Sequence, residues 1–470
     1  MLHRSASELA EAIRRREISS VELVSAHLQH LREINPLINA AVHIREEFAL
    51  REASAADRRL VSGERCQPLH GVPFSVKDSI DVAGAPSTAG TLGRKNAAPA
   101  TEDATLVKRL RAAGAIPIAK TNLPDLLFSF ETDNLLFGRT NNPYDLSRTC
   151  GGSSGGEAAL VAAGGSPLGL GSDCLGSIRV PAAFCGLAAI KPTSGRLPRT
   201  GHVPPASGWI EKLWQIGPMA RRTEDVVLAM QLLSGEDGAD FTVPPAPLLG
   251  NIEELKLHIA FFTHNGIAKV SDAVRTAVES CAAALSACGI KVEERRPPRV
   301  EQAYELEMAI LGADGCDGID TYLNEIGSTS VHPLLTNFVN RMRPFRASAS
   351  EFAKGWMEWD QYRSDMMRFF SQYDVVLCPV YPQTAIEHGA SMNDEQFAGF
   401  SYTMAWNLAG YPAATVRCAE AGGLPINVQV VAKPWRELAA LSVCNLIEEQ
   451  FGGWKPSPLM RVEGVAEVCR

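Results

Sequence analysis

Hydrophobic positions in the first 60 residues recur with the spacing of helices. The apolar positions separated by three or four residues, which share one helical face, are Val21, Val24, Leu28 and Leu31. Ser-x-x-Glu pairs begin at Ser5 and at Ser19, and this pattern is typical of a capping box at a helix N-terminus. The pattern therefore predicts an N-terminal helical region over residues 1–60.

From Leu69 onward, short apolar runs alternate with helical patterns. The expected strands are Val72–Val76, Ile116–Ala119 and Pro167–Gly171, and the expected helices are Thr105–Ala113 and Glu157–Ala163. Such alternation predicts an α/β sheet with helices on its faces.

A proline-rich segment, Val243–Leu249, is the one linker that the sequence indicates. The alternation resumes beyond it, with expected strands at Leu255–Phe262 and Lys291–Arg295 and a helix at Ser271–Cys288. We expect these elements to join the same sheet. Residues 300–372 are aromatic-rich and predict a mostly helical region.

Composition excludes several classes of protein. The 470 residues carry a net charge of −8, which argues against a nucleic-acid or anionic-membrane partner. Neither an apolar run of about 18 residues nor a secretory leader is evident, so no membrane span is expected. Eleven cysteines without C-x-x-C spacing predict reduced thiols in a cytoplasmic protein and no zinc or other metal site. No cofactor is expected, and the protein is expected to be a monomer or homodimer.

The segment Cys150–Gly156 surrounds Ser153 and Ser154 with four glycines, directly before a predicted helix. Glycines permit unusual backbone angles and a close approach by other groups, and the N–H groups of the helix N-terminus point toward such a loop. A flexible linker is one alternative. A phosphate-binding loop is another, but no Lys-Ser/Thr pair follows the glycines.

Two further segments carry candidate chemistry. Gly169–Arg179 places Ser177 at the end of a glycine-rich turn after a predicted strand, where successive N–H groups can converge on a developing oxyanion. Lys77 follows the apolar run Gly71–Val76. Burial would favour the neutral form of this amine, although taken alone it could equally be a surface lysine.

The three segments together resemble the amidase signature family. The signature runs from Gly151 to Arg196, with Ser153 and Ser177 separated by 24 residues and Lys77 lying 76 residues upstream of Ser153. Matching flanks are Thr88–Thr91, Asp103–Thr105, Lys120–Asn122, Gly138–Pro143, Gly217–Ala220, Thr223–Asp225, Asn407–Ala413 and Gly423–Pro425. The resemblance extends to bacterial amidases, aryl acylamidases, urethanases and fatty acid amide hydrolase.

The resemblance implies an α/β amidase signature fold, with a central twisted mixed β-sheet flanked by helices on both faces. It implies one amidase domain over residues 1–470. Residues 69–235 would form the catalytic core, and residues 250–470 the C-terminal part, with a variable helical substrate-binding region at about 300–372.

The resemblance also implies a division of roles. Lys77 would be the neutral base, Ser153, on a cis peptide after Gly152, the bridge, and Ser177 the acyl-forming nucleophile. A free lysine has a pKa of about 10.4, so burial must lower it before the amine can take a proton. The expected oxyanion-hole N–H groups belong to Cys174, Leu175, Gly176 and Ser177, and the expected loop-supporting residues are Ser154, Asp173 and Arg179.

Two observations bear on this assignment. Leu175 stands where the family usually has glycine; its N–H remains, but leucine tolerates a positive φ poorly. The G-x-S-x-G pattern of histidine-based hydrolases is absent around Ser177. We therefore expect the ten histidines to be surface or structural residues.

Apolar and aromatic residues flank the signature. Those expected to line a substrate pocket, with core packing as the alternative, are Leu126, Leu127, Phe128, Phe130, Trp209, Ile210, Trp214, Trp356, Met357 and Trp359. They predict a small-molecule substrate, namely a hydrophobic amide, anilide or carbamate (urethane). Esterase side activity on the same triad is an alternative. The alternatives are the glutaminase subunit of a tRNA-dependent amidotransferase and a non-catalytic binding protein.

Overall fold

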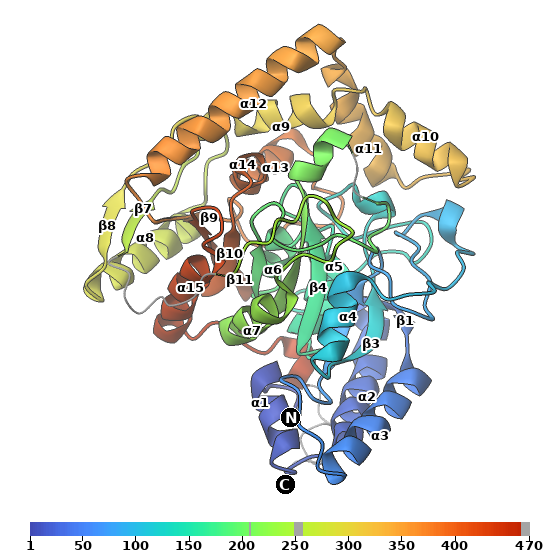
Figure 1. Cartoon of the computed structure of the whole chain (residues 1–470). Helices are drawn as coiled ribbons and strands as arrows, with labels where there is room; N and C mark the ends of the chain where they lie inside the picture. Colours follow the sequence, from blue (N-terminus) through green and yellow to red (C-terminus); the bar gives the residue numbers. More distant parts are fainter. Residues whose placement is uncertain (206–207, 249–256, 462–470) are drawn as a thin grey trace.

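One mixed β-sheet runs through the molecule (Figure 1). The computed structural model describes residues 1–205, 208–248 and 257–461. Within these ranges eleven strands lie in the order β1-β3-β2-β4-β6-β5-β10-β11-β9-β7-β8. The strands are β1 Ala41–Ile44, β2 Pro73–Lys77, β3 Ile116–Thr121, β4 Leu168–Asp173, β5 Ala188–Lys191, β6 Gln215–Ala220, β7 His258–Phe261, β8 Lys291–Glu294, β9 Val375–Pro379, β10 Ala413–Ala421 and β11 Leu424–Ala432.

Helices cover both faces of this sheet, as the sequence predicted. The helices of the described chain are α1 Ala6–Arg14, α2 Ser20–Ile38, α3 Glu46–Val61, α4 Thr105–Ala112, α5 Gly155–Ala162, α6 Arg179–Phe184, α7 Thr223–Leu233, α8 Asp272–Ala287, α9 Ala303–Leu311, α10 Asp317–Glu325, α11 Pro333–Met342, α12 Ala349–Phe370, α13 Asp394–Gly399, α14 Ser401–Ala409 and α15 Glu437–Phe451. Helices α4, α7, α15 and α8 pack against one another as one layer, whereas α2, α5 and α6 form another. None of them is long and apolar enough to cross a membrane.

The N-terminal helices confirm the capping pattern. Ser5 and Ser19 each accept a hydrogen bond from the N–H three residues later, and the glutamate at that position bonds back to the serine N–H. Three of the four apolar positions on the predicted face of α2 are buried, whereas Val21 is half-buried. The helical start of the chain follows from these local signals.

The strands after the linker join the same sheet, which confirms that prediction. Strand β7 lies parallel to both β8 and β9. Residues 243–248 contain neither helix nor strand, whereas 249 and the first two residues of the expected strand at 255–262 lie outside the described residues.

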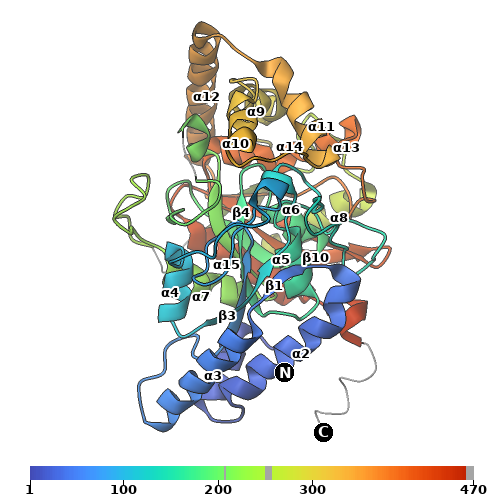
Figure 2. The same ribbon diagram turned by 90° about the vertical axis from the view of Figure 1, so that its right-hand side faces the viewer.

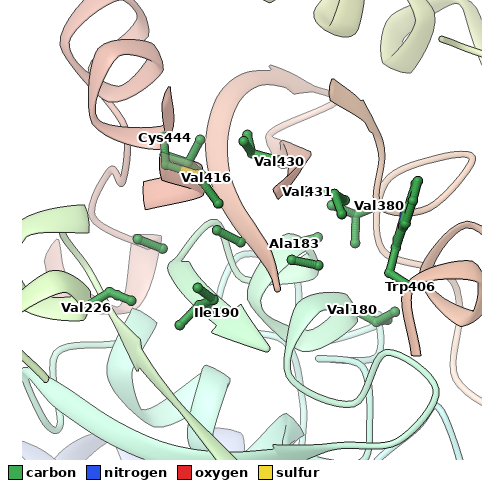
Figure 3. Close-up of a cluster of buried hydrophobic side chains, with 14 of the residues drawn as sticks. Val180, Ala183, Ile190, Val226, Val380, Trp406, Val416, Val430, Val431 and Cys444 are labelled. Atoms are coloured by element: carbon green, nitrogen blue, oxygen red, sulfur yellow. The ribbon is translucent and has the colours of Figure 1, made fainter. Parts of the chain in front are cut away.

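The central core joins early and late parts of the chain. Figure 3 shows side chains of α6, β5 and α7 meeting those of β10, β11, α14 and α15, with Ile190, Val416 and Val430 among them. All three are fully buried. This packing fixes α6, which begins two residues after Ser177.

Helices α9 to α12 form a cap at one end of the molecule (Figures 1 and 2). The longest, α12, is tied to α14 beneath it, because Trp359 Nε1 donates to the carbonyl of Leu408 at 2.8 Å and the Tyr362 hydroxyl donates to that of Ala405 at 3.1 Å. The predicted helical region at 300–372 is therefore a cap anchored to the sheet domain through α14.

Candidate active site

Strand topology brings the candidate residues to one edge of the sheet. Strands β2 and β4 are parallel neighbours, with Val76 paired to Leu170. Because parallel strands end on the same side, Lys77 at the end of β2 lies beside the turn that follows Asp173 at the end of β4. The glycine-rich loop before α5 completes the group, and its Gly152–Ser153 peptide is cis.

Lys77 is fully buried and is surrounded by oxygen atoms of serines. Its Nζ lies 2.7 Å from Ser153 Oγ and 2.9 Å from Ser154 Oγ. It also lies 3.1 Å from the hydroxyl and 3.3 Å from the carbonyl oxygen of Ser172. No carboxylate of the described chain makes an ion pair with this amine.

Burial holds the pKa of Lys77 well below its usual range. The charges of Asp173 and Glu157 act in the opposite direction but are outweighed by the loss of hydration. An amine in this environment can be neutral at ordinary pH and can accept a proton from a hydroxyl group.

Ser177 lies on the turn that faces this group. Its carbonyl accepts a hydrogen bond from the N–H of Ser154 at 3.1 Å. The residue is 8% exposed, and both it and Ser153 line the same cavity. The structure thus brings the three predicted triad residues, Lys77, Ser153 and Ser177, to one site.

A buried ion pair shapes the turn before Ser177. Arg179 donates to Asp173 through Nε at 3.0 Å and through Nη2 at 2.9 Å. The same guanidinium donates to the carbonyl of Thr403 at 2.9 Å and to Gln429 Oε1 at 2.7 Å. Burial alone would raise the pKa of Asp173, but Arg179 and Asn407 hold it well below its usual range.

The backbone of this turn has little freedom. Gly176 has a φ of +133°, and a Cβ there would lie 2.3 Å from Thr403 Oγ1, so only glycine fits. Its N–H donates to Asp173 Oδ1 at 2.9 Å and is therefore engaged with that carboxylate. Leu175 is not among the described residues with positive φ, so its side chain causes no backbone strain. The N–H groups of Leu175 and Ser177 have no acceptor within the described residues.

A cavity of about 130 Å³ opens at Ser153 and Ser177. Its walls are mainly apolar and aromatic. Lining residues expected from the sequence are Leu126, Leu127, Phe128, Phe130, Ile210 and Trp214. Those not expected from it are Ser129, Ser172, His202, Pro204, Pro205, Leu311 and Phe338. Cys174 and Leu175 also line it.

Four of the expected pocket residues lie elsewhere. Trp209 Nε1 donates to the carbonyl of Ile310 at 2.8 Å, so its ring ties the segment after residue 207 to α9. Trp356 and Trp359 pack against each other on α12, with ring centroids 5.0 Å apart. Met357 is exposed on the same helix. None of the four is among the described residues that line this cavity.

Two buried titratable residues near the site were not singled out from the sequence. His202 Nε2 lies 3.2 Å from Ser172 Oγ, although the histidines were expected to be surface or structural residues. Glu157 bonds to the hydroxyls of Ser75 and Thr121, and burial raises the pKa of its carboxyl to about 8. The position of Glu157 on a helix with no polar face was a signal of burial that the sequence did contain.

The chain matches one known family over most of its length. The family model described as Amidase matches residues 22–441. The chain belongs to the amidase family. This amidase is thus a hydrolase that acts on carbon–nitrogen bonds, and its resemblance to the family's motifs is confirmed over most of its length.

Relatives of this amidase differ in what they act on. The chain is 34% identical over 461 residues to indoleacetamide hydrolase of Bradyrhizobium diazoefficiens, and the match covers 95% of this chain and 86% of that protein. It is 32% identical over 484 residues to one of the subunits of glutamyl-tRNA(Gln) amidotransferase of Carboxydothermus hydrogenoformans, covering 97% and 98%. The solved structure of 6-aminohexanoate cyclic dimer hydrolase aligns with a TM-score of 0.87 at 27% identity, covering 98% and 99%. The last comparison confirms the predicted fold.

Proposed function

We propose that this amidase hydrolyses compact hydrophobic amides, anilides or carbamates through a Lys77–Ser153–Ser177 triad. Ser177 Oγ attacks the substrate carbonyl carbon and passes its proton to Ser153, whose own proton moves to Lys77 Nζ. The proton returns by the same route to the leaving nitrogen as the carbon–nitrogen bond breaks. Water then cleaves the resulting ester of Ser177 and releases the acid.

The observation that carries this proposal is the environment of the Lys77 amine. It is fully buried, makes no ion pair among the described residues, and lies 2.7 Å from a hydroxyl that shares a cavity with Ser177. A lysine kept only as a structural cation would need a carboxylate partner to offset its desolvation. A lysine that serves as a base needs a hydroxyl, and Lys77 has one.

The turn before Ser177 supports the proposed oxyanion hole in a narrower form. The N–H of Gly176 is held by Asp173, whereas those of Cys174, Leu175 and Ser177 have no acceptor within the described residues. We therefore assign the developing negative charge to these three donors, all of which belong to residues that line the cavity.

The cavity supports a compact substrate group. Its volume, about 130 Å³, is close to that of cavities of about 150 Å³ that hold one benzene ring. Phe128, Phe130, Trp214 and Phe338 supply aromatic walls. A single aryl or short branched group fits these walls better than an extended acyl chain.

A substrate panel combined with active-site labelling tests the function. We expect turnover of nitroanilides and nitrophenyl carbamates that carry one-ring groups, and at least tenfold lower kcat/KM for long-chain acyl anilides. A fluorophosphonate probe should label the wild type but not Ser177→Ala. Turnover of small polar amides alone, or labelling that survives in Ser177→Ala, contradicts the proposal.

A glutaminase role is the second candidate, favoured by the full-length match to a component of an amidotransferase. Glutamine carries two charges, and the only charged residue among the described lining residues is Asp173, which is already paired with Arg179. We therefore expect glutamine to be a poor substrate. Glutamine hydrolysis that exceeds turnover of every aryl amide would favour this candidate instead.

A further inference from the structure

A histidine that the proposed mechanism does not use lies beside the triad. His202 is 7% exposed and lines the same cavity as Ser153 and Ser177. Its ring centroid lies 4.4 Å from that of Trp214. Its two ring nitrogens face different kinds of partner, and this difference fixes which nitrogen carries the proton.

The Nδ1 atom of His202 is a donor. It lies 2.9 Å from the carbonyl oxygen of Pro204, and a carbonyl can only accept. Burial lowers the pKa of this imidazole to about 3, and the positive charge of Arg199 lowers it as well. The ring is therefore neutral at ordinary pH, and its Nε2 atom can only accept.

The Nε2 atom faces two hydroxyl groups, on Ser172 at 3.2 Å and on Ser79 at 3.0 Å. Both hydroxyls can share the one lone pair of Nε2, and within the described residues this atom is the only partner of Ser172 Oγ besides Lys77. Once the Ser172 proton points at His202, the lone pairs of Ser172 Oγ face the rest of its surroundings. Toward the Lys77 amine, 3.1 Å away, Ser172 Oγ then acts as the acceptor.

Backbone hydrogen bonds likewise fix the Ser154 hydroxyl as an acceptor toward Lys77. Its hydroxyl donates to the carbonyl of Ser172 at 3.1 Å and accepts from the Ser172 N–H at 3.2 Å. Toward Lys77 it can therefore only accept. A neutral amine has two hydrogens and one lone pair. The Ser154 and Ser172 hydroxyls, at 2.9 and 3.1 Å, lie closer to Nζ than the Ser172 carbonyl oxygen at 3.3 Å, and they take the two hydrogens. The lone pair remains for Ser153, which makes the shortest contact, at 2.7 Å.

We propose that His202 is a positioning residue that keeps the Ser172 hydroxyl an acceptor toward Lys77, so that the lone pair of the neutral amine points at Ser153. The inference rests on the proposed function of Lys77 as the base. His202 itself gains and loses no proton: the proton that leaves Ser177 ends on Lys77. Without the imidazole, the Ser172 hydroxyl is free to turn and donate to the Lys77 lone pair, in competition with Ser153.

Removing the acceptor should slow chemistry more than it weakens binding. We expect His202→Phe to lower kcat by about 10- to 100-fold while KM changes by less than about threefold, since a misdirected hydrogen bond acts on proton transfer. The amide oxygen of His202→Gln reaches the place of Nε2, so this variant should keep kcat within about fivefold of the wild type. Thermal unfolding of each variant verifies the fold.

A double-mutant cycle shows whether His202 acts through Ser172. In a Ser172→Ala background, His202→Phe should cost less than about twofold in kcat, because the hydroxyl that it orients is gone. Ser79→Ala is the matched control, since it removes the other hydroxyl at Nε2, does not touch Lys77, and should leave kcat unchanged.

Three results would overturn the inference: wild-type kcat in His202→Phe, a loss in His202→Gln as large as in His202→Phe, or the full His202→Phe loss in the Ser172→Ala background. If His202→Phe does not fold, His202→Gln is compared with the double variant His202→Gln, Ser172→Ala. A loss in kcat from His202→Gln that persists when the Ser172 hydroxyl is absent contradicts the inference. Lys77→Ala, measured in parallel, distinguishes a failure of the proposed function from a failure of this inference. Wild-type turnover in Lys77→Ala contradicts the triad assignment. An inactive Lys77→Ala together with wild-type kcat in His202→Phe contradicts only the role of His202.

Discussion

Two neighbouring strand ends each bury a lysine, and the two sites differ in what surrounds the amine. Lys77 on β2 and Lys120 on β3 are both fully buried, and Val76 pairs with Lys120 across the two parallel strands. Lys120 Nζ lies 3.4 Å from an Asp78 carboxylate oxygen, 2.8 Å from Ser87 Oγ and 3.1 Å from the carbonyl of Pro86. Among the described residues, the partners of Lys77 Nζ are three serine hydroxyls and one carbonyl oxygen.

The difference teaches what distinguishes a candidate base from a structural cation. Burial lowers the pKa of both lysines, but at Lys120 the charge of Asp78 works against burial from ion-pair distance. At Lys77 the acidic groups lie farther away and burial prevails, so its pKa lies well below the usual range. Burial alone is therefore an incomplete criterion, and the type of partner decides.

The largest expected effect separates the two amines by activity. Lys77→Met should lower kcat by about 10³-fold or more, because the relay loses its proton acceptor. The thioether chain fills the same space, so circular dichroism and the unfolding temperature should stay near wild type. Retention of more than a tenth of the wild-type kcat would remove the distinction that we draw between the lysines.

The same substitution at Lys120 should lower the free energy of unfolding rather than kcat. Lys120→Met leaves the Asp78 carboxylate buried without its cation, which costs about 3–5 kcal/mol of unfolding free energy. Chemical denaturation measures this loss, and kcat per folded active site should change by less than about threefold. A large loss of kcat in fully folded protein would show that Lys120 also takes part in the chemistry.

The pH dependence sharpens the comparison. The proposed relay needs neutral Lys77, so kcat/KM should rise with pH through the Lys77 pKa and level off well below pH 10. An acid limb with its midpoint near 10.4 would mean that the amine is solvated in the active enzyme. If the acid limb has the same midpoint in Glu157→Gln as in the wild type, the Glu157 carboxyl is not the group that sets the Lys77 pKa.

Glu157 adds a stability prediction of the same kind. Its carboxyl has a pKa of about 8 when folded, above its usual value, so the folded chain holds a proton that the unfolded chain releases at lower pH. The stabilisation is therefore complete below about pH 4.5 and is lost as pH rises through 8. We expect wild-type stability to fall more steeply between these values than that of Glu157→Gln. Equal slopes in denaturation series at several pH values would show that Glu157 is ionised.

The smallest expected effect concerns single hydroxyls. Ser87→Ala removes one of several oxygen partners of Lys120 and should cost about 1 kcal/mol of stability with unchanged kcat. Ser154→Ala removes an acceptor from Lys77 and should lower kcat by about tenfold or more. Similar kinetic effects of the two substitutions would mean that the lysine environments do not differ as described.

Much of the fold follows from local pattern. The strands ending near Lys77 and Asp173 and the helix after Ser154 were predictable, because apolar runs and glycine turns encode them directly. Their meeting was predictable through the family resemblance, since strand order is set by contacts far apart in the chain.

The pocket was less predictable, because an aromatic residue lines a cavity or fills a core according to its neighbours. Trp209 and Trp214 stand five residues apart on one segment, yet the first binds a carbonyl of α9 and the second lines the cavity. The role of His202 was equally hidden. Only the spatial approach of Ser172, 30 residues away in sequence, gives its Nε2 atom a partner in the site.

The closure of the Ser177 turn has a consequence for synthesis on the ribosome. Thr403 donates to the carbonyl of Leu175 and accepts from Arg179, and Gln429 holds the same guanidinium. A nascent chain that has just passed Arg179 already contains the three proposed triad residues but none of these later partners. We therefore expect the Ser177 turn to close only after strand β11 has left the exit tunnel.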